Sequence, residues 1–156
     1  MARTVIFTMG LPGAGKSTVA NRIHPDAAWI DPDEIKKSHP DYDPKNPGAI
    51  HAWSQDETER VWNNLLAGNT DDDETIMDGT GTNAEKMIRR IRQARAAGFR
   101  TALLYVRVGL DVAIYRNANR SRVVPEHIIR RKALDITTAF DLCSGEVDTI
   151  NVVNND

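Results

Sequence analysis

The sequence predicts an α/β fold in which helices cover both faces of a parallel sheet. Short runs of β-branched and apolar residues alternate along the chain with longer segments whose apolar residues recur at helical spacing. Strands that alternate with helices favour parallel pairing, because each helix supplies the right-handed crossover to the next strand. No repeat, low-complexity tract or linker divides the chain, so we expect residues 1–156 to form a single domain of three layers.

Five segments have the composition of strands. The first is β-branched and aromatic and stops at a glycine, which favours a buried strand. The fourth is the most apolar of the set. The expected strands are residues 4–9, 27–30, 74–77, 101–108 and 147–153.

The segments between the strands carry recognisable helix ends. Asn83 is a capping residue, Gly98 is a terminating one, and Pro125 stands where a first helical residue is favoured. Residues 38–48 are rich in proline and turn formers, so we expect a loop there. Helices are expected at residues 16–23, from about 31–33 onward, at 50–67, between 83 and 98, at 111–119 and at 125–142.

Composition is typical of an ordinary globular protein. Of the 156 residues, 40% are hydrophobic and 27% are charged, and the net charge of −2 gives no overall field for nucleic acid. The single cysteine, Cys143, excludes a disulfide within the chain and a zinc site built on cysteines. No apolar run approaches the roughly 20 residues of a membrane span, and no signal peptide opens the chain. We therefore expect a cytoplasmic protein with no membrane partner.

Residues 10–17, Gly-Leu-Pro-Gly-Ala-Gly-Lys-Ser, match the P-loop pattern G-x-x-x-x-G-K-[ST] in full. Glycines let backbone N–H groups converge on an anion, and the helix that follows adds its positive end. The lysine of this pattern reaches the β- and γ-phosphates of ATP, and the serine hydroxyl binds Mg²⁺. A plain glycine turn is the alternative, but strand, loop and helix occur in the order that nucleotide binding requires. The predicted ATP-binding residues are Gly10, Pro12, Gly13, Ala14, Gly15, Lys16, Ser17 and Thr18, with Ser17 as the metal ligand.

A carboxylate pair follows the second expected strand. Phosphoryl transfer needs a base for the acceptor hydroxyl, cations for the γ-phosphate and a pocket for the acceptor. The carboxyl ends of parallel strands meet at the ligand crevice, so Asp31 and Asp33 are candidates for the base. Asp31 also suits a helix N-cap with Pro32 as the first helical residue, which leaves Asp33 for chemistry. A purely structural role for both is the alternative.

Arginines gather where the helix at 111–119 ends. Arg116 and Arg120 are four residues apart and share one face of an expected helix. Such residues can close over a γ-phosphate as an arginine finger supplied by the same chain. We expect a short lid at about residues 116–125. The alternative is a solvated basic surface, because cations are favoured at a helix C-terminus in any protein.

The loop after the third expected strand, Asp78-Gly79-Thr80-Gly81-Thr82, also faces the crevice. Its glycines allow the backbone to approach a ligand closely, and the carboxylate of Asp78 and the hydroxyl of Thr80 can bind an acceptor. A simple strand-to-helix turn is the alternative, since Asp-Gly and Thr-Gly suit turns.

Four segments with recognisable motifs follow one another along the chain: GLPGAGKST, IDPDEIKKSHPDYDP, IMDGTGTN, and RNANR with RVVPEHIIR. This ordered set resembles the zeta toxin family of P-loop kinases and is similar to the kinase half of phage polynucleotide kinases. The first motif is generic, whereas the set is specific, and the resemblance runs from Thr4 to about Val153. It implies an adenylate-kinase-like P-loop fold with five parallel strands in the order 2-3-1-4-5 and a short arginine-rich lid.

The resemblance also implies roles for individual residues. ATP would be the donor, with Lys16 and Ser17 on its phosphates and Mg²⁺, and Asp33 would activate the acceptor. If the chain acts as a toxin, the resemblance implies an inhibitory protein partner. The matching residues are Lys16, Asp33, Arg116 and Arg120 for catalysis, Arg116, Arg120 and Arg122 for the nucleotide, and Asp33, Lys36, Asp78 and Thr80 for the acceptor.

The acceptor itself is left open. Position 82 is threonine, where the zeta toxins that phosphorylate nucleotide sugars look to carry arginine. The alternatives are a small molecule or nucleotide sugar, and a nucleic-acid hydroxyl such as a 5′-hydroxyl or a hydroxymethylated base. Trp53 and Trp62 could stack on a base, although packing of an amphipathic helix against the core explains them better. A different class is a nucleotide-dependent switch or ATPase that has no phosphoryl acceptor.

Basic residues crowd the helix expected between 83 and 98. They could follow a phosphate backbone, or they could form the solvated face opposite the apolar stripe of that helix. These residues are Lys86, Arg89, Arg90, Arg92 and Arg95.

Overall fold

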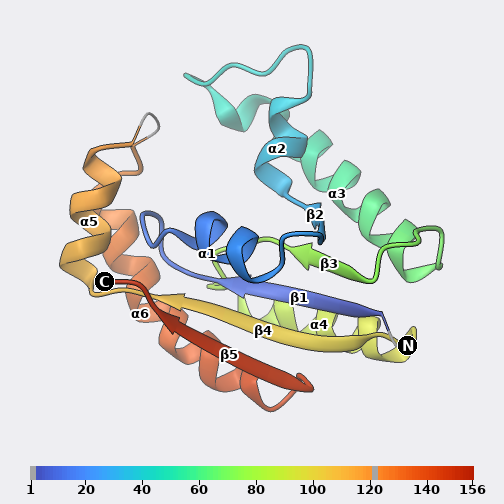
Figure 1. Cartoon of the computed structure of the whole chain (residues 1–156). Coiled ribbons are helices and arrows are strands. Elements are labelled where there is room, and N and C mark those ends of the chain that lie inside the picture. The colour runs from blue at the N-terminus through green and yellow to red at the C-terminus, as the bar shows by residue number, and fades with distance from the viewer. Residues whose placement is uncertain (1–2, 121–122) are drawn as a thin grey trace.

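The computed structural model describes residues 3–120 and 123–156 and contains one five-stranded sheet (Figure 1). All four strand pairings are parallel, and the order is β2-β3-β1-β4-β5. The predicted fold class and strand order are therefore confirmed. The strands are β1 (Thr4–Met9), β2 (Ala28–Ile30), β3 (Glu74–Met77), β4 (Arg100–Arg107) and β5 (Thr149–Asn154).

Six α-helices and one 3₁₀ helix connect the described strands. Among the described residues, no helix is both long enough and apolar enough to cross a membrane. The helices are α1 (Lys16–Ile23), α2 (Pro32–Lys37), η1 (Pro47–Ile50), α3 (His51–Leu66), α4 (Ala84–Ala96), α5 (Leu110–Ala118) and α6 (Glu126–Ser144).

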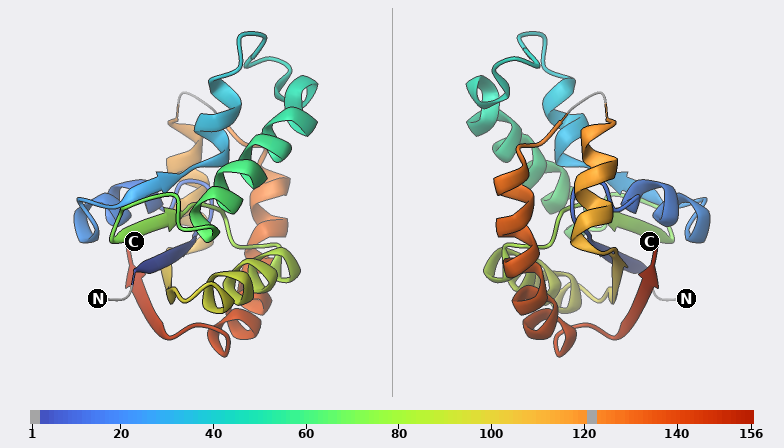
Figure 2. Two further views of the ribbon diagram at one scale, coloured as in Figure 1. Left: turned by 90° about the vertical axis from the view of Figure 1, so that its right-hand side faces the viewer. Right: turned by 90° about the vertical axis from the view of Figure 1, so that its left-hand side faces the viewer.

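Strand alternation divides the core into two clusters, one on each face of the sheet. Val5, Phe7 and Met9 of β1 point into the larger cluster, where they meet buried residues of α3, α4 and α6. Ile6, between them, points into the smaller cluster beneath α1. The two clusters give the molecule its three layers, with the sheet between the two helical faces (Figures 1 and 2).

Several boundaries differ from the expected ones by one or two residues, and three of these differences have a local structural setting. The strand expected at 147–153 begins at Thr149, because Asp148 first turns to bond the start of β4 at Thr101. The helix expected at 50–67 is preceded by the 3₁₀ turn η1 and becomes α-helical at His51. The helix expected at 111–119 ends at Ala118, so Arg120 lies beyond it rather than on its face.

Two projections flank the carboxyl ends of the central strands. On one side, α2 and α3 rise together from the β2 edge of the sheet and form, with the chain between them, an arm of residues 32–66 (Figures 1 and 2). On the other side stands α5 (Figure 1). Between these projections lie the residues that follow β1, β2 and β3. This edge of the sheet is where a parallel α/β fold binds its ligands.

Candidate active site

The glycine-rich loop joins β1 to α1 and lines a cavity of about 410 Å³. Gly13 and Gly15 have φ angles of 87° and 81°, which side-chain-bearing residues rarely adopt. A Cβ at Gly13 would lie 2.6 Å from the carbonyl oxygen of Ala113, so the loop packs directly against α5. The sequence predicts glycine here for an anion cradle, and the structure shows that packing against α5 requires it as well.

Two side chains from outside the P-loop hold it in place through the carbonyl oxygen of Ala14. This oxygen accepts a hydrogen bond from Asn155 Nδ2 at 2.8 Å and a longer one from Arg116 Nη1 at 3.4 Å. Asn155 immediately follows β5, at the far end of the chain. No sequence pattern marks this asparagine as a loop anchor, because the contact arises only when β5 takes its place beside β4.

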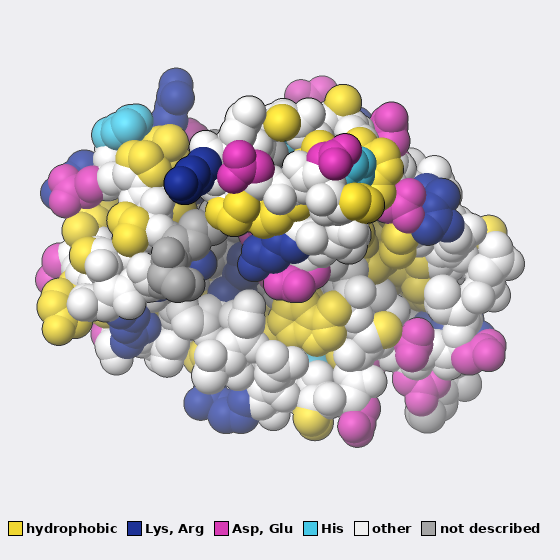
Figure 3. Space-filling view, turned by 90° about the horizontal axis from the view of Figure 1, so that it is seen from above, with side chains coloured by type: hydrophobic (Ala, Val, Ile, Leu, Met, Phe, Trp, Pro, Cys, Tyr) yellow, Lys and Arg dark blue, Asp and Glu magenta, His cyan; other side chains and the backbone are white. Residues whose placement is uncertain are grey.

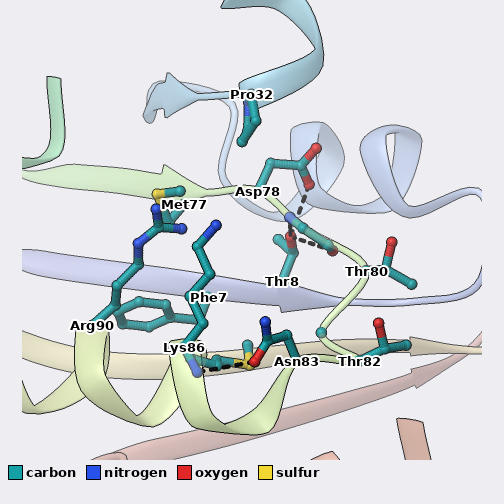
Figure 4. A pocket seen from close by; sticks show the side chains of 13 residues that line it. Phe7, Thr8, Pro32, Met77, Asp78, Thr80, Thr82, Asn83, Lys86 and Arg90 are labelled. Atoms are coloured by element: carbon teal, nitrogen blue, oxygen red, sulfur yellow. Dashed lines mark hydrogen bonds between the residues drawn. The ribbon is translucent and has the colours of Figure 1, made fainter. Parts of the chain in front are cut away.

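Lys16 connects the P-loop to the loop after β3. Its ammonium donates to the carbonyl oxygen of Gly79 at 2.8 Å and lies 3.5 Å from Oδ1 of Asp78. The Thr8 hydroxyl donates to Asp78 Oδ1 at 2.8 Å and accepts from the Gly79 N–H at 3.1 Å (Figure 4). Thr8, a buried residue of β1, is therefore a site residue that the sequence analysis missed. Threonine is common in β-strands, so its presence in β1 does not indicate a role in the site.

The two carboxylates after β2 separate as the sequence predicts. Asp31 caps α2: its Oδ1 accepts from the N–H groups of Asp33 at 3.0 Å and Glu34 at 3.4 Å. Burial raises the pKa of Asp31, and the charge of Asp78 raises it further against the effect of these hydrogen bonds. Asp33 is thereby left on the first turn of α2, where it lines the P-loop cavity and also a second cavity of about 650 Å³ between α2, α3 and α4.

The arginines after β4 face the P-loop. Arg116 and Arg120 both line the P-loop cavity, Arg116 from α5 and Arg120 from the turn after it. The buried side chain of Asn117 closes the base of this turn: it donates to the Val124 carbonyl at 2.7 Å and accepts from the Val124 N–H at 3.0 Å. Arg122, the third expected lid arginine, lies outside the described residues.

The expected acceptor contacts line two adjoining cavities. Asp78 and Thr80 line a cavity of about 210 Å³ between the loop after β3 and α4, and Asp78 also lines the P-loop cavity. Lys36 lines the larger cavity on the arm side, with its ammonium 3.3 Å from Nδ1 of His51. Seen from above, basic side chains gather with an acidic one along a hollow in this face of the molecule (Figure 3).

The two tryptophans considered for base stacking have different surroundings. Trp62 is fully buried, packs edge-on against Phe7 and donates to Gln93 at 2.9 Å. Trp53 is 37% exposed and packs edge-on against His39. Neither is among the residues that line the three cavities. Core packing thus accounts for Trp62, and the expectation that Trp53 is a core position of α3 is wrong.

The donor set around Ser17 suits Mg²⁺. Ser17 lines the P-loop cavity together with Asp31, and the described residues contain no group of three or more His, Cys, Asp or Glu side chains placed to hold a metal. Mg²⁺ usually keeps several waters and is bound by one or two protein oxygens and the phosphates of the nucleotide. A single hydroxyl beside the P-loop is therefore a sufficient protein contribution.

The fold is shared with solved structures of low sequence identity. A chain of the PezAT toxin–antitoxin system of Streptococcus pneumoniae matches with a TM-score of 0.73 and 15% identity, covering 99% of this chain and 68% of its own. Shikimate kinase from Acinetobacter baumannii, in complex with shikimate, matches with a TM-score of 0.61 and 18% identity over 100% and 86% of the two chains. A chain of the Pnkp1/Rnl/Hen1 RNA repair complex matches with a TM-score of 0.73 and 11% identity over 90% and 46%.

These matches confirm, at the level of the fold, the predicted likeness to toxin and nucleic-acid repair kinases. This chain spans about two thirds of the PezAT chain and less than half of the RNA repair chain. A search of curated proteins found no match. A protein-family model matches residues 5–142, from β1 to the end of α6. The chain belongs to the family that this model describes, the AAA domain family AAA_33.

Proposed function

We propose that the chain is an ATP-dependent kinase that transfers the γ-phosphoryl group to a hydroxyl of an acceptor molecule. The observation that carries the proposal is the place of Asp33. This residue lines both the P-loop cavity and the larger cavity beside it. A carboxylate at the junction of a nucleotide site and a second pocket is where a base for an acceptor hydroxyl belongs. A nucleotide switch has no need of this arrangement.

The geometry supports the following reaction. The acceptor enters the cavity beside α2 and places its hydroxyl between Asp33 and the γ-phosphate. The hydroxyl oxygen forms a bond to the γ-phosphorus as the bond from that phosphorus to the β–γ bridging oxygen breaks, and ADP leaves. Asp33 accepts the hydroxyl proton. The products are ADP, the phosphorylated acceptor and one proton, which the carboxylate releases to solvent.

The other residues of the P-loop cavity supply positive charge where negative charge collects. Lys16 would hold the β- and γ-phosphates, and the backbone N–H groups of the loop would surround them. Arg116 and Arg120 would close on the γ-phosphate from the α5 side. Ser17 would help to hold Mg²⁺ beside the phosphates of the nucleotide, where the ion would supply positive charge.

Two further expectations concern the cellular compartment of the protein and a protein partner. The single cysteine, Cys143, cannot form a disulfide within the chain, which suits the cytoplasmic setting that we propose. The similar PezAT structure is a toxin–antitoxin system. An inhibitory protein that covers the P-loop edge is the partner we propose if expression of the chain arrests growth.

The test is transfer from γ-labelled ATP to a panel of acceptors. The panel contains nucleotide sugars, 5′-hydroxyl oligonucleotides, DNA with hydroxymethylated pyrimidines and small alcohols. We expect label on at least one acceptor with the wild type. We expect none with Asp33→Asn, although its ATP affinity stays within a few-fold, because the amide cannot accept the proton.

Asp41→Asn is the matched control, because Asp41 is an exposed carboxylate on the same arm and lines none of the three cavities. Full transfer by Asp33→Asn would remove Asp33 as the base. If no acceptor is labelled and none changes the rate of ATP hydrolysis, the result would favour a nucleotide-dependent switch instead.

A further inference from the structure

The basic residues of α4 do not form one surface. Arg92 and Arg95 turn toward the segment before β5: Arg92 pairs with Glu146 at 2.8 Å, and Arg95 lies 3.7 Å from Asp148. Lys86 and Arg90 turn the other way, into the cavity of about 210 Å³ beside the loop after β3 (Figure 4). A solvated face explains the first pair of arginines but not the second pair of cations.

Arg90 is buried with part of its hydrogen-bonding capacity unused. Only 7% of the residue is exposed. One terminal nitrogen, Nη2, donates to Glu59 at 2.7 Å, and the guanidinium lies 6.0 Å from the ring centroid of Trp62. Its Nε is buried and has no hydrogen-bond partner among the described residues. A buried N–H without a partner costs free energy, which a bound acceptor atom would recover.

Lys86 stands one helical turn before Arg90, on the same wall of the cavity. Its ammonium makes no hydrogen bond or ion pair within the described ranges 3–120 and 123–156. Burial lowers the pKa of Lys86, and the charges of Arg90 and Arg89 lower it further, against the attraction of Glu59. Two like charges four residues apart on a helix repel each other, so this arrangement favours a negative ligand.

The carboxylate that lines this cavity pairs with neither Lys86 nor Arg90. This residue, Asp78, accepts from Thr8 on the opposite side and lies 3.5 Å from the ammonium of Lys16. Hydroxyls of Thr80 and Thr82 line the cavity beside the loop. The apolar side chains that line the cavity are Phe7, Pro32, Met77 and Met87.

We propose that Lys86 and Arg90 form a subsite for an oxyanion carried by the acceptor, a phosphate or a carboxylate. The inference rests on the proposed kinase function and narrows it: the substrate is an anionic alcohol, whose hydroxyl meets Asp33 while its charged group lies on α4. Arg90 alone could be a structural bridge from α4 to Glu59 and Trp62 of α3. Lys86 has no such second role, and it is the residue on which the test depends.

The first experiment measures anion binding without turnover. The full-length chain is saturated with ADP and Mg²⁺ so that the P-loop is occupied, and inorganic phosphate is titrated by calorimetry. Loss of one charged donor typically costs a factor of ten to a hundred in affinity, so we expect about that weakening in Lys86→Gln. Arg92→Gln, which removes an equal charge from the other side of the same helix, should bind phosphate as the wild type does. Phosphate in the γ-position of the P-loop would be insensitive to Lys86.

The second experiment measures transfer from γ-labelled ATP to glycerol, glycerol 3-phosphate and glycerate. We expect the wild type to prefer an anionic probe over glycerol by roughly tenfold or more in kcat/KM, and the better of the two anions identifies the charged group. Lys86→Gln should erase the preference, whereas Arg92→Gln should keep the preference, the rate with glycerol and the KM for ATP. Arg90→Lys keeps the buried positive charge, so this variant should retain part of the preference for the anionic probe.

The outcomes separate the two proposals. If Lys86→Gln still binds phosphate and still prefers an anionic probe over glycerol, the proposed subsite is wrong, and the proposed kinase function is unaffected. An ADP-loaded wild type that binds no phosphate would overturn the subsite as well. If phosphate binding depends on Lys86 but no acceptor receives label, the anion subsite is supported and the proposed kinase function is wrong.

Discussion

The ammonium of Lys16 lies 2.8 Å from the carbonyl oxygen of Gly79, so this side chain joins the P-loop to the loop after β3. The same ammonium is 3.5 Å from Asp78, and both side chains are largely shielded from solvent. An arriving triphosphate must therefore compete with a carbonyl and a carboxylate for this cation.

Lys16→Ala should abolish nucleotide turnover and weaken ATP binding. The ammonium is the one charged donor of the loop, and removing a preorganised donor from a phosphoryl-transfer site costs on the order of 10²–10³ in rate. Calorimetric titration with ATP–Mg²⁺ and single-turnover assays measure the two effects. Lys45→Ala, at an exposed loop position, is the control. Turnover within a few-fold of the wild type would contradict the assignment.

Arg120→Ala should lower kcat far more than it raises the KM for ATP. Arg120 is exposed in the turn after α5 and lines the P-loop cavity, so we expect it to contact the γ-phosphate only as charge develops there. Arginine fingers contribute roughly 10³-fold or more in related chemistry. Steady-state kinetics with the best acceptor provide the measurement. Arg131→Ala, an exposed arginine of α6, should be silent, and an unchanged kcat in Arg120→Ala would refute the lid role.

Asp148 should make the junction of β4 and β5 sensitive to acid. Hydrogen bonds from the backbone N–H and the hydroxyl of Thr101, at 2.8 and 3.1 Å, lower the pKa of Asp148, and Arg95 lowers it further. Because the folded-state pKa lies below the unfolded value of about 3.9, the carboxylate stabilises the fold above that pH. This stabilisation disappears as the pH falls through the folded-state pKa.

Urea unfolding at pH 7 and at several values below pH 4 tests this dependence. Asp148→Asn should have a lower midpoint than the wild type at pH 7, and the difference should shrink in acid. Asp135→Asn, at an exposed carboxylate of α6, serves as the control. A difference in midpoint that is constant from pH 7 to pH 2 would show that the carboxylate charge is not responsible.

The parts of the fold that follow from local pattern were predictable from the sequence. The alternation of strands and helices identified the parallel sheet, and the P-loop pattern marked the cradle. Asp31 could be assigned as a cap because Asp-Pro at a helix start has a local physical reason. The end of α5 was predicted within one residue, but the four-residue spacing of Arg116 and Arg120 wrongly suggested that both share a helix face.

Contacts between distant segments could not be predicted in the same way. Thr8 meets Asp78 across two neighbouring strands, and Asn155 meets Ala14 across nearly the whole chain. Neither residue belongs to a motif. The division of the basic residues of α4 also depends on which neighbours the helix receives, because Arg92 and Arg95 find carboxylates before β5 and Lys86 does not. The sequence shows the charges, and only the packing shows where they point.

The helix that bears Asp33 is unusual in its attachment to the molecule. None of the six residues of α2 is buried, and its neighbour is α3 rather than the sheet. The proposed proton acceptor therefore sits on an element that can tilt at little energetic cost, while the phosphate cradle is wedged between the sheet and α5. Closure on a correct acceptor would then be a movement of the arm toward a fixed nucleotide. Selectivity would reside in how well each alcohol draws α2 inward.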